Sequence, residues 1–121
     1  MRFARITAAL LVGMFLAVAC SSSPDGQTGA AGDQPVADVE IRTFQFRPDA
    51  LEMSVGTKVV WTNRDDIDHT ATSGTPDSPD GTFDGAMNEQ GDTASFTFAE
   101  PGTYPYYCRI HNGMRGEIRV T

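Results

Sequence analysis

The chain has 121 residues, which is room for one domain, and its 16 acidic residues outnumber 9 basic ones, for a net charge of −7. This balance argues against nucleic acid as a partner, because binding to phosphates requires Lys and Arg. Only two cysteines are present, Cys20 and Cys108.

The first nineteen residues have the features of an export signal. Arg2 and Arg5 precede an apolar run over 6–19, which is too short to anchor the chain in a bilayer. The run ends Leu-Ala-Val-Ala before Cys20, a pattern that suits signal-peptidase cleavage and also resembles a bacterial lipobox. We therefore expect a signal peptide over 1–19 and a lipid on Cys20. The alternative is plain secretion with a free cysteine.

Residues 20–36 are rich in Ser, Gly, Ala and Asp and have no apolar periodicity, so they predict a flexible linker. A linker of this length spans roughly 20 Å, enough for a folded head to meet a partner above a membrane. Removal of 1–19 leaves 16 acidic and 7 basic residues, a charge of −9. If Cys20 carries lipid, Cys108 has no disulfide partner, and a free thiol outside the cytoplasm suggests a metal.

From residue 37 to 121 the pattern is that of a β domain. Apolar residues alternate with polar ones in short runs that end at Gly, Pro or Asp turns. Phe44 and Phe46 are expected to share the inner face if a bulge lies near Thr43. Residues 74–92 are expected to form a loop with at most one short edge strand. Seven or eight strands in this arrangement favour an all-β, Greek-key β-sandwich.

The stretch from Cys108 to Met114 places a thiol, an imidazole and a thioether at the spacing C-x-x-H-x-x-M. Alone, each is ordinary: a small buried hydrophobe, a surface histidine, a core methionine. Together with a second histidine they form the ligand set of a blue-copper electron-transfer site, in which the methionine is a weak axial ligand. The only other histidine is His69, so the predicted copper ligands are His69, Cys108, His111 and Met114.

Two stretches carry a resemblance to a known family: Trp61-Thr62-Asn63 followed by His69, and the run Pro-Gly-Thr-Tyr-Pro-Tyr-Tyr-Cys over 101–108 with its His and Met. They resemble the cupredoxins, or blue copper proteins, over about 37–121. The two-residue gaps after Cys108 and His111 resemble the short loop of amicyanin rather than the longer loop of plastocyanin. The resemblance implies a sandwich that holds one type 1 copper and passes single electrons between larger redox proteins.

Three neighbours of the ligands depart from the family pattern. Asp68 stands where Pro often precedes the upstream histidine, Thr70 where Asn often follows it, and Ile110 where amicyanin has Pro. The amides of Thr70 and Ile110 could reach the Cys108 sulfur and raise the reduction potential, whereas the charge of Asp68 would favour Cu(II).

The surroundings of the loop histidine predict where a partner would dock. We expect the outer edge of His111 to reach the surface, inside an apolar patch of Ile67, Ile110 and Met87. Scattered surface apolar residues are the alternative reading.

Other functions make different demands on the sequence. A copper nitrite reductase or multicopper oxidase needs further histidines, and a copper carrier favours exposed ligands, whereas Cys108 is predicted to point inward. A metal-free adhesive sandwich leaves the ligand set unexplained. We therefore expect a monomeric electron carrier, not an enzyme, that works outside the cytoplasm between a redox donor and acceptor while anchored to a membrane. The alternative is copper binding or trafficking without electron transfer.

Overall fold

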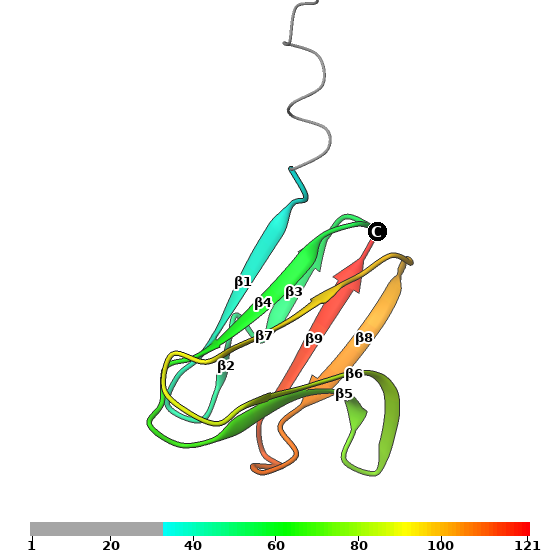
Figure 1. The fold of residues 1–121 in the computed structure, drawn as a ribbon. Coiled ribbons are helices and arrows are strands. Elements are labelled where there is room, and N and C mark those ends of the chain that lie inside the picture. Colours follow the sequence, from blue (N-terminus) through cyan, green and yellow to red (C-terminus); the bar gives the residue numbers. More distant parts are fainter. Residues whose placement is uncertain (1–32) are drawn as a thin grey trace, which may run out of the picture.

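The computed structural model describes residues 33–121, which form nine strands and no helix (Figure 1). Accordingly, this part of the chain offers no helix that could cross a membrane. The predicted signal peptide, the lipidated Cys20 and most of the linker lie outside the described residues. The strands are β1 (Val36–Ile41), β2 (Phe46–Arg47), β3 (Ala50–Met53), β4 (Lys58–Asn63), β5 (His69–Thr75), β6 (Ser78–Met87), β7 (Thr93–Thr97), β8 (Gly102–Tyr107) and β9 (Arg115–Val120).

The strands form two sheets that pack face to face. One sheet has the order β2-β1-β4-β7 and the other β3-β9-β8-β5-β6. Most neighbours are antiparallel, but β1 pairs in parallel with β4, and β3 with β9. The predicted all-β sandwich is confirmed. The strand count exceeds the expected seven or eight partly because β2 has only two residues.

Strand β6 is the clearest difference from the predicted elements. Residues 74–92 were expected to be mostly loop, yet β6 runs for ten residues along β5. Its Gly, Pro and Asp residues are weak strand formers, but β6 lies at the edge of its sheet, where Pro79 needs no partner for its outer side. The backbone of β5 supplies the pairing that composition alone does not predict, as in Thr72 opposite Asp84.

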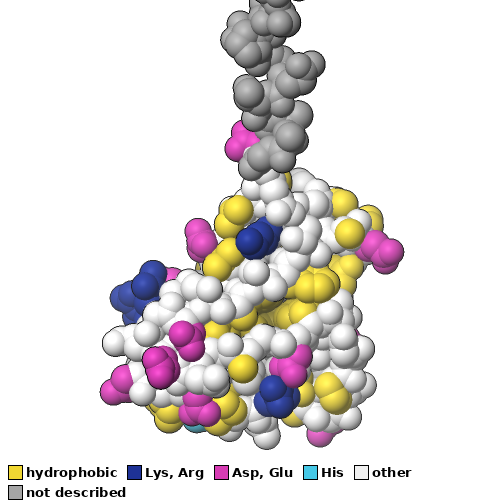
Figure 2. Space-filling model, viewed as in Figure 1, with side chains coloured by type: hydrophobic (Ala, Val, Ile, Leu, Met, Phe, Trp, Pro, Cys, Tyr) yellow, Lys and Arg dark blue, Asp and Glu magenta, His cyan; other side chains and the backbone are white. Residues whose placement is uncertain are grey.

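The core lies between the sheets and is dominated by aromatic rings. Trp61 stacks on Phe83 with ring centroids 5.2 Å apart, and Tyr106 meets Trp61 edge-on at 5.5 Å. A cavity of about 400 Å³, lined among others by Trp61, Phe83 and Phe96, opens where the edge strands β6 and β7 face each other. Figure 2 shows hydrophobic side chains gathered in the hollow on this face of the molecule.

The chain termini of the described part and the loop with the predicted ligands lie at opposite ends of the sandwich. Residue 33 and the C-terminus lie at one end, and the loop between β8 and β9, with Cys108 and His111, lies at the other (Figure 1). The described chain therefore begins far from the loop that carries the predicted ligands.

A group of polar residues stabilises the tip of the β5–β6 hairpin. The buried hydroxyl of Ser73 donates to Asp80 Oδ1 (2.5 Å) and accepts the amide N–H of Phe83 (2.9 Å). Asp80 Oδ1 also accepts the amide N–H of Thr82 (2.9 Å). These two hydrogen bonds from Ser73 and Thr82 hold the pKa of the Asp80 carboxyl below its usual value of 3.8.

This lowered pKa predicts an acid-dependent part of the stability. An Asp with a lower pKa in the folded state contributes stability above pH 3.8, and the contribution is lost as the pH falls towards the folded-state pKa. Asp80→Asn keeps an oxygen acceptor but cannot titrate, so its urea midpoint should fall less steeply than the wild-type midpoint between about pH 5 and pH 3. The control Asp77→Asn, in the turn of the same hairpin, should follow the wild type. Equal acid dependence in Asp80→Asn and wild type would contradict the assignment.

Candidate metal centre

The sulfur of Cys108 is fully buried at the end of β8. The loop that follows is closed by two backbone bonds, from the Cys108 amide to the Met114 carbonyl (3.3 Å) and from the Met114 amide to the His111 carbonyl (2.9 Å). Strand β9 begins directly after Met114, at Arg115. Three predicted ligands are therefore carried on one short loop whose ends are fixed by adjacent strands.

The fourth predicted ligand comes from the neighbouring strand. His69 is the first residue of β5 and is fully buried, with its Nδ1 3.9 Å from Cys108 Sγ. The ring centroids of His69 and His111 are 5.0 Å apart. Met114 is also buried, at 3% exposure. The sequence separation of 39 residues between His69 and Cys108 is thus closed by the fold, as the predicted site requires.

One backbone donor reaches the sulfur. The Thr70 amide lies 3.3 Å from Cys108 Sγ, in the position that was expected of it. Ile110 has an exposed side chain, and the hydrogen bonds of residues 33–121 include none from its amide to this sulfur. Instead, the amide of the preceding Arg109 donates to the Thr70 hydroxyl (2.9 Å). Asp68 is exposed.

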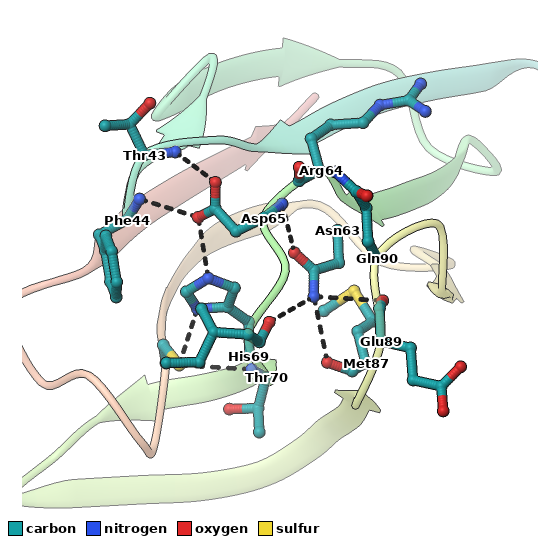
Figure 3. A network of polar contacts seen from close by, with 12 residues as sticks. Thr43, Phe44, Asn63, Arg64, Asp65, His69, Thr70, Met87, Glu89 and Gln90 are labelled. Carbon is teal, nitrogen blue, oxygen red and sulfur yellow. Dashed lines mark hydrogen bonds and ion pairs between the residues drawn. The ribbon is translucent and has the colours of Figure 1, made fainter.

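Asp65 contacts a predicted ligand, His69, and the sequence analysis did not single it out. Its Oδ2 lies 3.0 Å from His69 Nε2, and its two oxygens accept the amides of Thr43 (2.7 Å) and Phe44 (3.0 Å), as Figure 3 shows. Burial alone would raise the pKa of Asp65, but the hydrogen bonds from Phe44, Thr43 and His69 together hold it below its usual value. A carboxylate on the far nitrogen of a histidine fixes which nitrogen is free to bind a metal. Here that nitrogen is Nδ1, which faces Cys108.

The loop that carries Asp65 is itself braced by Asn63. The buried Asn63 amide donates to the carbonyl of Ile67 (2.7 Å) and approaches that of Glu89 (3.3 Å), and its Oδ1 accepts the amide of Asp65 (2.9 Å). These bonds connect the residues between β4 and β5 to the turn after β6 (Figure 3). Asp65 is therefore held both at its backbone, by Asn63, and at its carboxylate, by the amides of Thr43 and Phe44. These bonds position the carboxylate for its contact with His69.

Phe44 occupies an unexpected position over the site. Thr43 and Phe44 both have left-handed backbones, with φ of 55° and 59°, a conformation that non-glycine residues rarely adopt. The two amide bonds to Asp65 hold this turn, which turns Phe44 away from the core and leaves it 49% exposed. Its ring meets His69 at 5.5 Å and His111 at 5.0 Å, both edge-on. The expectation that Phe44 faces inward with Phe46 is therefore wrong.

The surroundings of His111 bear on whether a metal fits. Its Nε2 is buried and has no hydrogen-bond partner among the described residues. The expectation that the outer edge of the ring reaches the surface is therefore wrong for this nitrogen. Buried polar atoms are nearly always paired, so an unpaired nitrogen in a ring that lies 5.0 Å from the His69 ring suits a metal ligand. Counting only His, Cys, Asp and Glu, residues 33–121 contain no cluster of three close enough to hold a metal ion. The fit to copper therefore rests on the donor chemistry, which includes the thioether of Met114.

Comparison with known proteins decides the family. Residues 34–121 match the model described as "Copper binding proteins, plastocyanin/azurin family". The chain belongs to this family. The predicted cupredoxin resemblance is thereby confirmed, and copper is the cofactor. Membership also supports copper electron transfer as the general function.

Individual relatives agree with this assignment. Amicyanin of Paracoccus denitrificans is 30% identical over 118 residues, which cover 84% of this chain and 90% of that protein. Plastocyanin of Fritillaria agrestis is 34% identical over 88 residues, 64% of this chain and 53% of that protein. Among solved structures, a purple cupredoxin from Nitrosopumilus maritimus matches at a TM-score of 0.65 and 30% identity, over 70% of this chain and 99% of that one.

The contact between Asp65 and His69 predicts weaker metal binding when it is lost. Asp65→Ala should lower copper affinity by about 10- to 100-fold, because carboxylates behind metal-bound histidines contribute on that scale. Competition titration against a chelator measures the change. Asp66→Ala, an exposed neighbour of the same charge, is the control and should keep the wild-type affinity. Equal affinities for the two variants would show that the carboxylate does not act through His69.

Proposed function

We propose that the chain carries single electrons on one type 1 copper ion bound by His69, Cys108, His111 and Met114. The observation that carries this proposal is the buried Cys108 thiol, which faces His69 Nδ1 at 3.9 Å and accepts the Thr70 amide. When bound at such a site, copper supplies a one-electron couple between Cu(I) and Cu(II).

The residues of the chain set the properties of this site. The Cys108 thiolate would be the strong donor to copper, His69 and His111 would supply imidazole nitrogens, and Met114 would supply a weak thioether donor. The Thr70 amide withdraws electron density from the sulfur and so favours the reduced state. Because β5, β8 and β9 position the donors, a bound copper ion would need little rearrangement of the chain to change its oxidation state.

An enzymatic role is not favoured. A copper-containing nitrite reductase from Thermus scotoductus SA-01 is structurally similar, with a TM-score of 0.59, but the match covers only 22% of that chain. The present chain has two histidines, and the proposed site uses both. A role in copper trafficking is disfavoured by burial, since His69, Cys108 and Met114 are at most 3% exposed.

Transient redox proteins, one donor and one acceptor, are the proposed partners. Three exposed apolar side chains, Phe44, Ile67 and Ile110, suit a docking surface. Of these, Phe44 packs directly against His111. The patch was expected to contain Met87, but that side chain is fully buried, and the exposed Phe44 belongs to the proposed surface instead. We propose that the protein is a monomer.

The chain is further proposed to act outside the cytoplasm, anchored through lipid on Cys20. This rests on the sequence features of residues 1–36 and on the position of residue 33, which lies at the end of the sandwich opposite the Cys108 loop (Figure 1). A tether attached at that end leaves the proposed copper site accessible to partners.

The ligand assignment predicts distinct spectra for two variants. Cys108→Ala should abolish the intense blue absorption of the copper-loaded protein, because the thiolate supplies the transition. Met114→Ala should retain copper but change the reduction potential, because a thioether would bind copper only weakly. Visible spectroscopy and voltammetry measure both effects, and Cys20→Ala serves as a cysteine control that stays blue. Blue colour in Cys108→Ala would show the assignment to be wrong, and a colourless wild type would favour copper trafficking.

The anchor predicts a change of location. Cys20→Ser cannot receive a thioether-linked lipid, so the protein should move from the membrane fraction to the soluble fraction of the host cell. Fractionation and intact mass of the wild type measure this. A wild-type mass without added lipid would rule the anchor out.

A further inference from the structure

A chain of hydrogen bonds leads from the surface to the peptide that follows Cys108. The Arg109 amide donates to Thr70 Oγ1 (2.9 Å), Thr70 Oγ1 lies 2.9 Å from Thr72 Oγ1, and Thr72 Oγ1 donates to Asp84 Oδ1 (2.8 Å). Thr70 and Thr72 are two residues apart on β5, so their side chains share a face of the strand. Asp84 lies opposite Thr72 on β6.

The direction of every proton in this chain follows from its outer end. An ionised carboxylate only accepts hydrogen bonds, so the single hydroxyl proton of Thr72 is directed to Asp84. Thr72 can then only accept from Thr70. The proton of Thr70 is thereby used, and its oxygen is left to accept the Arg109 amide.

Arg109 and Asp84, the two ends of this series of hydrogen bonds, also contact each other at the surface. The Arg109 guanidinium donates from Nε to Asp84 Oδ1 at 3.1 Å, where both side chains are about half exposed. The hydroxyls beneath are buried, with Thr70 3% and Thr72 5% exposed. Hydrogen bonds shielded from water are stronger and polarise one another. Arg109 thus contributes its amide to the inner end of the chain and its side chain to the outer end.

We propose that Asp84 is a positioning residue for the Cys108 thiolate, acting through the hydroxyls of Thr72 and Thr70. The chain holds the peptide between Cys108 and Arg109 against β5, and so keeps the Thr70 amide on the sulfur at 3.3 Å. This inference rests on the proposed electron-transfer function for its effect on potential, but its effect on geometry is independent of metal.

If the hydrogen bonds from Arg109 to Asp84 only stabilised the fold, their loss would not affect the Cys108 sulfur. Strand β5 offers a matched control for this distinction. Ser73, the next residue, is also buried and also donates a hydroxyl hydrogen bond to a carboxylate, that of Asp80. Its network remains at the β5–β6 hairpin and does not contact Cys108 or Arg109. Loss of either hydroxyl should destabilise the hairpin, but only loss of Thr72 should affect the sulfur.

The test compares Thr72→Val with Ser73→Ala in the full chain. In the metal-free protein, Thr72→Val should speed hydrogen exchange of the Arg109 and Thr70 amides by about fivefold, the scale of one hydrogen bond. In the copper-loaded protein it should lower the reduction potential, because the Thr70 amide, a donor that favours Cu(I), is held less firmly on the sulfur. Ser73→Ala should leave both exchange rates and the potential unchanged. Equal behaviour of the two variants would overturn the proposal.

Two surface variants keep the test decisive if Thr72→Val folds poorly. Asp84→Asn retains an oxygen that accepts from Thr72 and should preserve the slow exchange of the Arg109 amide, whereas Asp84→Leu removes the acceptor and should lose it. Loss of protection in both variants, or in neither, would overturn the role of the acceptor. A wild type without blue colour would refute the proposed function, while the exchange rates of the metal-free protein would still decide the positioning role.

Discussion

The burial of one sulfur atom between two distant segments is the constraint on which the site depends. The start of β5 supplies two polar neighbours to the buried Cys108 Sγ, the Thr70 amide and the His69 ring. Strand β5 lies beside β8 in the sheet, although β6 and β7 separate the two strands in the sequence. The contact between His69 and Cys108 therefore depends on the topology of the sandwich and not on local sequence spacing.

The polar groups around the site divide into two sets with different tasks. One set, centred on Asp65, controls His69 and the turn that carries Phe44. The other, from Thr70 to Asp84, lies next to the sulfur. His69 and the network beside Cys108 thus end on separate carboxylates, Asp65 between β4 and β5 and Asp84 on β6. Such separation would allow one ligand to be tuned without displacing the other.

The sequence predicted what depends on local spacing and missed what depends on contacts across the fold. The two-residue gaps in the loop of Cys108, His111 and Met114 are visible directly, and the scarcity of histidine identified His69. Asp65 could not be distinguished from its neighbours, because nothing in the sequence says which of several acidic side chains in a turn points inward.

The misplaced elements have the same physical origin. Phe44 followed an alternating pattern that suggested burial, but two hydrogen bonds to Asp65 stabilise a left-handed turn that reverses its direction. Strand β6 was missed because its pairing comes from β5 and not from its own Gly, Pro and Asp residues.

Residue 33 and the Cys108 loop lie at opposite ends of the sandwich, which has a further consequence. A surface that held the protein by residue 33 would therefore face the end of the sandwich opposite the Cys108 loop, and at least the length of the sandwich would separate that surface from the loop.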